Sequence, residues 1–120
     1  QELITASTEN IPIKIVVFNN GNHGMVRQWQ KIFYNSKFSA SELSHHTPDY
    51  VKLAESMGAI GLRMTKKDDV KKIFTEMLNI NDKPVLIDCV VDPDDMVFPM
   101  VPAGGSNDQI IMNEEDLKQL

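Results

Sequence analysis

The sequence has a single cysteine, Cys89, so no disulfide can form within these 120 residues. Cys89 lies inside the apolar run VLIDCVV, where a free cysteine behaves as a small buried hydrophobic residue. No histidine lies near it in the sequence, which argues against a catalytic thiol. The lack of a disulfide is compatible with a reducing compartment, and we expect a bacterial-type cytoplasmic location.

Long hydrophobic runs and excess positive charge are also missing. No stretch of about 18 apolar residues predicts a membrane span, and no signal peptide is recognisable. A net charge of -5 argues against nucleic acid as the main partner. The basic pairs Lys66–Lys67 and Lys71–Lys72 are interleaved with acids, as on a solvated helix face. With 42% hydrophobic and 24% charged residues, the composition is that of one ordinary globular domain or part of one.

Short apolar segments alternate with helical patterns along most of the chain. Strands are predicted at 12–18, 59–64 and 84–92, since these runs are apolar and rich in β-branched residues. Helices are predicted at 1–9, from Gly24 onward, from Thr47 to Gly58, and after Thr65. Thr47 and Thr65 are the expected N-caps, with Pro48 at a first helical position.

This alternation predicts an α/β fold, a three-layer parallel sheet with helices on both faces. We expect residues 1–92 to form part of one domain and residues 93–120 to form a C-terminal arm. The arm has prolines, a glycine pair and no regular period, which is typical of a lid or binding arm, or of disorder. Asn113 is the expected cap of a final helix.

A turn at Asn19–Gly24 follows the first predicted strand, at the sheet edge where parallel sheets bind ligands. Asparagine and glycine are common turn formers, so a purely structural turn is one explanation. The alternative is that the Asn20 amide oxygen and the Asn22 carbonyl hold Mg²⁺ beside a phosphate group. No Asp or Glu occurs from residue 12 to residue 41, so a carboxylate ligand must come from another segment. Amides at the start of the helix from Gly24 suit an anion.

The stretch FNNGNHGMVRQWQKIFY closely resembles the closing half of the thiamine-diphosphate motif in acetolactate synthase (acetohydroxyacid synthase) catalytic subunits. That motif opens with Gly-Asp-Gly and closes with Asn-Asn, and only the closing half is present here. The segments TPDYVKLAESMGAIGLRM and KPVLIDCVVDPDDMVFPMVPAGGSNDQII match the same family in order. The resemblance implies the C-terminal part of the thiamine-diphosphate-binding domain, with the acidic half of the motif lying before Gln1.

The resemblance also implies roles for individual residues. Asn20 is the implied side-chain ligand of Mg²⁺, and Asn22 supplies a main-chain oxygen. The implied cofactor-binding set is Asn20, Gly21, Asn22, His23, Gly24 and Met25. Met25 and Trp29 are the implied walls of the substrate channel, although both also fit the core stripe of a helix. Asn22-His23 departs from the usual family residues, which leaves the role of the His23 side chain open.

The implied activity is the decarboxylation of pyruvate and its condensation with a second 2-keto acid, pyruvate or 2-ketobutyrate, in branched-chain amino acid biosynthesis. The implied cofactors are thiamine diphosphate, Mg²⁺ and, mainly through another domain, FAD. The implied partners are the rest of the catalytic subunit, a second catalytic subunit that completes the active site at a dimer interface, and a small regulatory subunit. No catalytic residue is expected in this stretch, because the family's activating glutamate lies in a neighbouring subunit, so a fragment of this length is expected to be inactive.

Two other functions stay open on the sequence. One is a different thiamine-diphosphate-dependent decarboxylase, oxidase or carboligase. The other is a non-catalytic α/β binding module. His45 and His46 are more readily explained as exposed loop residues than as metal ligands, and Asp92, Asp94 and Asp95 as turn acids.

Overall fold

A computed structural model describes residues 1–43 and 45–119, and within it the chain forms two compact units. The first, which we call the sheet unit, comprises Gln1–Gly21 and Ser44–Asp92. The second, which we call the helix–arm unit, comprises Asn22–Leu43 and Pro93–Leu120. No helix within the described residues is long and apolar enough to cross a membrane.

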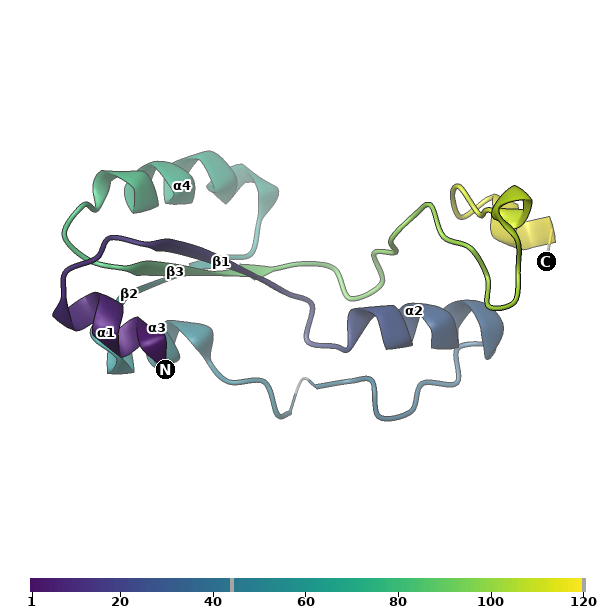
Figure 1. Ribbon diagram of the computed structural model, residues 1–120, viewed down its shortest axis with the longest axis horizontal. Helices are drawn as coiled ribbons and strands as arrows, with labels where there is room; N and C mark the ends of the chain where they lie inside the picture. Colours follow the sequence, from purple (N-terminus) through teal and green to yellow (C-terminus); the bar gives the residue numbers. More distant parts are fainter. Residues whose placement is uncertain (44, 120) are drawn as a thin grey trace. The chain divides into compact units, whose positions relative to one another are not determined.

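The sheet unit is built on three parallel strands in the order β1-β3-β2 (Figure 1). The strands are β1 (Lys14–Asn19), β2 (Ile60–Met64) and β3 (Val85–Val90). The central strand β3 is buried along almost its whole length, as its continuous apolar sequence predicts. In the register of the sheet, Asp88 of β3 lies opposite Val17 of β1 and Arg63 of β2.

Helices cover both faces of this sheet. Helix α4 (Val70–Asn79) packs on one face, and α1 (Glu2–Thr8) and α3 (Tyr50–Ser56) lie on the other (Figure 1). The core on the α4 side centres on Met64, Met77, Val85, Ile87 and Cys89. The core on the other side centres on Ala54, Ala59 and Leu86. The predicted three-layer α/β arrangement with a parallel sheet is therefore confirmed, as part of a domain.

Two predicted helix caps are wrong. The N-cap of α3 is Asp49 rather than Thr47, because the Asp49 carboxylate accepts hydrogen bonds from the amides of Val51 at 3.2 Å and Lys52 at 3.3 Å. Before α4, a 3-10 turn η1 (Lys67–Asp69) intervenes, so the helix starts after Asp69 and not at Thr65. The predicted stop at Gly58 agrees with the structure, since Gly58 follows the C-cap Met57 with a φ of 77°.

The helix–arm unit contains α2 (Gly24–Phe33), the loop that follows it, and the arm from Pro93. The arm has two short 3-10 helices, η2 (Asn107–Gln109) and η3 (Asp116–Gln119), and an antiparallel bridge between Met100 and Ile111. The final helix starts later than predicted, at Asp116. The Asn113 side chain accepts a hydrogen bond from the Glu115 amide at 2.8 Å, in the turn before η3.

Candidate functional site

The turn after β1 is organised by the first of its two asparagines. The Asn19 Oδ1 atom accepts the Gly21 amide at 3.0 Å, a local turn that asparagine side chains commonly form. Gly21 has a φ of 65°, in the left-handed region that glycine adopts without steric cost. The Asn19 Nδ2 atom donates to Asp88 Oδ1 at 3.0 Å. Asn19 therefore has a structural role in the turn, and the predicted metal contact falls on the neighbouring Asn20 and not on Asn19.

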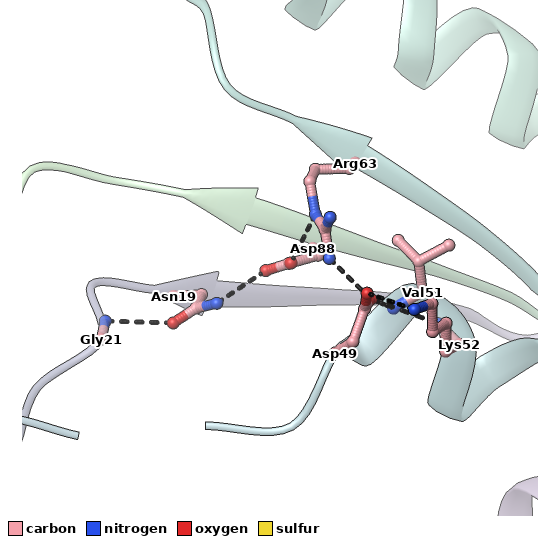
Figure 2. Close-up of polar contacts among 7 residues, drawn as sticks. All are labelled: Asn19, Gly21, Asp49, Val51, Lys52, Arg63 and Asp88. Atoms are coloured by element: carbon pink, nitrogen blue, oxygen red, sulfur yellow. Dashed lines mark hydrogen bonds and ion pairs between the residues drawn. The ribbon is translucent and has the colours of Figure 1, made fainter. Parts of the chain in front are cut away.

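Asp88 connects this turn to the rest of the sheet (Figure 2). Its second carboxylate oxygen, Oδ2, accepts Arg63 Nε at 3.0 Å. Arg63 Nη2 also donates to Asp49 Oδ1 at 2.6 Å. We call Asn19, Asp88, Arg63 and Asp49 the strand-end network, since it runs from β1 across β3 and β2 to the start of α3.

The hydrogen bonds of this network favour the charged forms of Arg63 and Asp49. The hydrogen bond to Asp88 is the main cause that raises the pKa of the Arg63 guanidinium, against the opposing effect of burial. Burial raises the pKa of the Asp49 carboxyl, but hydrogen bonds from the Lys52 amide and from Arg63 outweigh it and hold that pKa below its ordinary value. Arg63 and Asp49 are therefore both charged at neutral pH.

The remaining predicted cofactor residues lie in the helix–arm unit. The Asn22 backbone pairs with Glu42 in an isolated antiparallel bridge, and the His23 amide donates to the Ser41 carbonyl at 2.8 Å. His23 is the N-cap of α2 and its side chain makes no capping hydrogen bond. Gly24 and Met25 form the first turn of this ten-residue helix, whose free amides create a positive end. Asn20 and Gly21, by contrast, belong to the sheet unit.

The donor set at the turn fits part of a magnesium site. Amide and carbonyl oxygens are hard donors of the kind that Mg²⁺ accepts, usually together with carboxylates and phosphate oxygens. Within residues 1–43 and 45–119 no group of three or more His, Cys, Asp or Glu side chains could hold a metal ion. Asp88, the acid bonded to the turn, has both oxygens engaged by Asn19 and Arg63. These residues fit Mg²⁺ only if anionic ligands come from outside them.

Met25 and Trp29 line a hollow in the helix–arm unit instead of a closed core. This cavity of about 500 Å³ is lined by Met25, Val26, Trp29, Gln30, Tyr34, Lys37 and Ser39. A smaller hollow of about 160 Å³ lies against Trp29, Phe33, Tyr34, Pro102 and Ala103. The Trp29 and Phe33 rings pack at a centroid distance of 5.1 Å. Met25 is 52% exposed, so it does not serve as a core residue within this unit.

The arm is attached to α2 by Gln28. The Gln28 side chain is 4% exposed, its Oε1 accepts the Val97 amide at 2.8 Å, and its Nε2 donates to the Val97 carbonyl at 3.0 Å. Arg27 adds an ion pair with Asp94 at 2.8 Å, and its guanidinium lies 4.0 Å from the centre of the Phe38 ring. These contacts put the arm along α2, with Pro102 and Ala103 beside Trp29. The arm is therefore an ordered part of this unit.

Comparison with known proteins decides the family. Residues 1–89 match the family model described as thiamine pyrophosphate enzyme, C-terminal TPP binding domain. The chain belongs to this family. The thiamine pyrophosphate (thiamine diphosphate, TPP) domain is thus confirmed as predicted from the asparagine turn and the segments that follow it.

Relatives of this TPP domain include acetolactate synthases. The chain is 50% identical over 113 residues to the acetolactate synthase of Mycobacterium bovis, covering 92% of this chain and 18% of that protein. It is 47% identical over 113 residues to the acetolactate synthase large subunit of Corynebacterium glutamicum, with the same shares. It is 39% identical over 111 residues to the isozyme 2 large subunit of Escherichia coli K12, covering 92% of this chain and 20% of that protein. The chain therefore spans about a fifth of the length of these relatives.

A solved structure gives the same picture of the fold. The TPP domain aligns with the thiamine diphosphate-dependent 4-hydroxybenzoylformate decarboxylase of Rhodococcus jostii RHA1 with a TM-score of 0.65 and 29% identity. The alignment covers 78% of this chain and 17% of that chain.

Sequence reasoning missed the strand-end network. It placed Asn19 in the turn but predicted no contact among Asn19, Asp88, Arg63 and Asp49. One signal was available, because Asp88 is a lone carboxylate inside the most apolar strand, and a buried charge needs a partner. The partners themselves depend on the strand order, which the sequence does not contain.

Proposed function

We propose that this TPP domain belongs to an acetolactate synthase catalytic subunit. Such an enzyme decarboxylates pyruvate and condenses the remainder with a second 2-keto acid, pyruvate or 2-ketobutyrate, in branched-chain amino acid biosynthesis. The observation that carries the proposal is the Asn19–Gly24 turn at the carboxyl end of β1, in a chain that is 50% identical to acetolactate synthases. Thiamine diphosphate, when bound, supplies the carbanion chemistry that joins the two keto acids.

In this proposal the turn anchors the diphosphate end of the cofactor. The Asn20 side-chain oxygen and the Asn22 carbonyl are two neutral ligands of Mg²⁺, and a carboxylate and the diphosphate complete the ion's oxygen shell. The first amides of α2, at Gly24 and Met25, face negative charge favourably. Gly21 and His23 lie beside these ligands in the chain. FAD, the family's further cofactor, is expected to be held mainly by another domain.

The second part of the proposal concerns the keto acids. Met25 and Trp29 supply apolar wall to the 500 Å³ cavity of the helix–arm unit. A wall of this kind discriminates between acceptor side chains by contact area, which is worth about 1–3 kcal/mol for one methylene group. Trp29 is therefore the residue on which the choice between pyruvate and 2-ketobutyrate is expected to depend.

The partners follow from the same family. We expect the rest of the catalytic subunit, a second catalytic subunit and a small regulatory subunit, consistent with relatives that are named large subunits. Neither nucleic acid nor a membrane is an expected partner. The location is expected to be cytoplasmic, in keeping with the free, buried Cys89.

A second candidate is a different thiamine-diphosphate enzyme. The likeness to a 4-hydroxybenzoylformate decarboxylase favours it, since that protein is named for decarboxylation alone. Incubating the intact protein with pyruvate, and then with pyruvate and 2-ketobutyrate, separates the two. Acetolactate and acetohydroxybutyrate are the expected products. Acetaldehyde as the sole product would replace the synthase with a decarboxylase.

The metal role of Asn20 has its own test. Asn20→Ala in the intact protein should weaken Mg²⁺-dependent binding of thiamine diphosphate, followed by calorimetry, because one oxygen ligand is lost. Asn81→Ala is the matched control, an exposed asparagine in the loop after α4. Equal Mg²⁺ affinity in both variants would remove the assignment. The 120-residue chain alone should form no acetolactate, and measurable turnover would contradict that expectation.

A further inference from the structure

We propose that Asp88 is a positioning residue for the cofactor turn, acting through Asn19 and held in place by Arg63. The metal part of this inference rests on the function proposed above. The geometric part does not, because it concerns contacts within the sheet unit alone (Figure 2).

Burying the Asp88 carboxylate is too unfavourable for Asp88 to serve only as a packing residue. Its side chain is 3% exposed, and an ionised carboxylate without partners would strongly destabilise the buried centre of a sheet. Both oxygens are satisfied, Oδ1 by Asn19 Nδ2 and Oδ2 by Arg63 Nε, each at 3.0 Å. The contact that joins Asp88 to the turn is the one with Asn19, so we assign its effect on the turn to Asn19.

Asn19 is held at both ends of its amide group. Nδ2 donates to Asp88, and Oδ1 accepts the Gly21 amide at 3.0 Å. Rotating the amide by half a turn would set an oxygen against the Asp88 carboxylate and an NH₂ group against the Gly21 N–H. Asp88 therefore fixes which way the Asn19 amide points, and that orientation closes the turn at Gly21. Asn20 lies between these two fixed residues, so its backbone is held from both sides.

The other end of the strand-end network is anchored on α3. Arg63 bonds both Asp88 and Asp49, and Asp49 in turn caps α3 through the Val51 and Lys52 amides. Arg63 is 43% exposed along its side chain, so water competes for its hydrogen bonds more than for those of Asp88. The expected order of importance for the turn is therefore Asp88 first and Arg63 second.

The test is an exchange of the two side chains. Asn19→Asp alone puts two carboxylates together, and Asp88→Asn alone leaves one amide oxygen to serve both Asn19 and Arg63. The double variant Asn19→Asp/Asp88→Asn restores every contact. The amide NH₂ now at position 88 donates to the carboxylate now at position 19, and that carboxylate still accepts the Gly21 N–H. The amide oxygen at position 88 accepts Arg63 Nε. The net charge is unchanged.

The first readout is amide hydrogen exchange of the Gly21 segment in the intact protein without cofactor. Each single variant should exchange faster there, and the double variant should return toward wild type. The second readout is Mg²⁺ affinity in the presence of thiamine diphosphate, where loss of a group that orients a ligand typically costs about 10–100-fold. The single variants should show such a loss, and the double variant should recover most of it. Ser7→Ala is the matched control, since it removes a partly buried hydrogen bond of the sheet unit that lies outside the network.

The outcomes separate the two proposals. Faster Gly21 exchange with rescue, but no Mg²⁺ binding even in wild type, would overturn the proposed function and leave the positioning role of Asp88 standing. Normal Gly21 exchange in Asp88→Asn would overturn the positioning role, whatever the metal does. A double variant no better than the single ones would also overturn it. If Asp88→Asn does not fold, Arg63→Met tests the same link, with a smaller increase in Gly21 exchange expected.

Discussion

The sheet unit and the helix–arm unit are held together by different interactions. Every buried hydrophobic residue of the described chain except Ile111 lies in the sheet unit. The buried polar residues of the helix–arm unit are Gln28 and Ser41, and both make side-chain hydrogen bonds. The sheet unit thus depends on apolar burial, which is not directional, whereas the helix–arm unit depends on a few directional contacts. A single polar substitution can therefore displace the arm, whereas the apolar core of the sheet unit is sensitive mainly to changes in side-chain volume.

The largest effect is expected from emptying the sheet core. Ile87→Ala removes a side chain that is 0% exposed and should cost about 3–4 kcal/mol in the free energy of unfolding. Ile111→Ala is the counterpart in the helix–arm unit and should cost about 2 kcal/mol, because Ile111 belongs to neither large core cluster. Denaturation of the intact protein, with hydrogen exchange followed in residues 85–90 and 100–111, measures both. Equal losses would mean that the helix–arm unit has a core of its own.

Two glycines sharpen the same comparison. A Cβ at Gly61 would lie 2.6 Å from the Val51 carbonyl oxygen, so Gly61→Ala should push α3 away from β2 at a cost of about 2–3 kcal/mol. A Cβ at Gly104 meets no atom within 4 Å, and its φ of 77° leaves only backbone strain, roughly 1 kcal/mol. Thermal denaturation of the two variants gives the difference. If Gly61→Ala is as mild as Gly104→Ala, α3 does not rest directly on the strand.

Replacing the amide of Gln28 should release the arm while leaving the sheet intact. Gln28→Leu keeps similar volume but leaves the Val97 N–H and C=O unpaired, which should cost about 1–2 kcal/mol locally. The Val97 segment should then exchange its amide hydrogens faster, with no change in residues 85–90. Gln28→Glu is the matched variant, since it can still accept the Val97 amide, and it should show an intermediate rate. Uniform acceleration in both units would argue against this division of interactions.

The smallest effect is expected at Asp94. Its hydrogen bond with Arg27 is the main cause that lowers the pKa of the Asp94 carboxyl from its ordinary value of 3.8. A group with a depressed pKa in the folded state stabilises that state above its unfolded pKa, and the contribution is lost as the pH falls below 3.8 through the folded value. The amide hydrogens of the arm should therefore exchange faster at acidic pH, when the rate is compared at each pH with that of the Asp94→Asn variant. Parallel pH profiles for the two proteins would show that the pair does not hold the arm.

The sheet unit could be predicted well because its sequence repeats simple signals. The runs at residues 14–19, 60–64 and 85–90 are apolar and β-branched, and Gly58 ends α3 where a left-handed residue was expected. The α3 cap was missed because Thr47 and Asp49 are both good capping residues, two positions apart around Pro48. Local rules rank such candidates poorly, since the choice also depends on Arg63, which binds Asp49 from strand β2.

The arm and the strand-end network could not be predicted in detail for a common reason. The Gln28–Val97 and Asn19–Asp88 contacts each join residues 69 positions apart. No periodic pattern marks residues 93–106, and a side-chain amide leaves no trace in hydrophobic spacing. Asn20 and Asn22 were proposed from their place after the first strand and then from the family resemblance, and the channel role of Trp29 from the resemblance alone. All three roles stay predictions.

The Gln28 carboxamide has the same donor and acceptor as a peptide group. It therefore pairs with the main chain of the arm in the way that a neighbouring strand would. What it binds is the main chain at position 97, whose side chain is 62% exposed. Substitutions of that side chain other than proline should therefore leave the contact intact, whereas position 28 needs a side chain that can both donate and accept a hydrogen bond. Sequence variation should therefore be tolerated at position 97 in the arm and restricted at position 28 in α2.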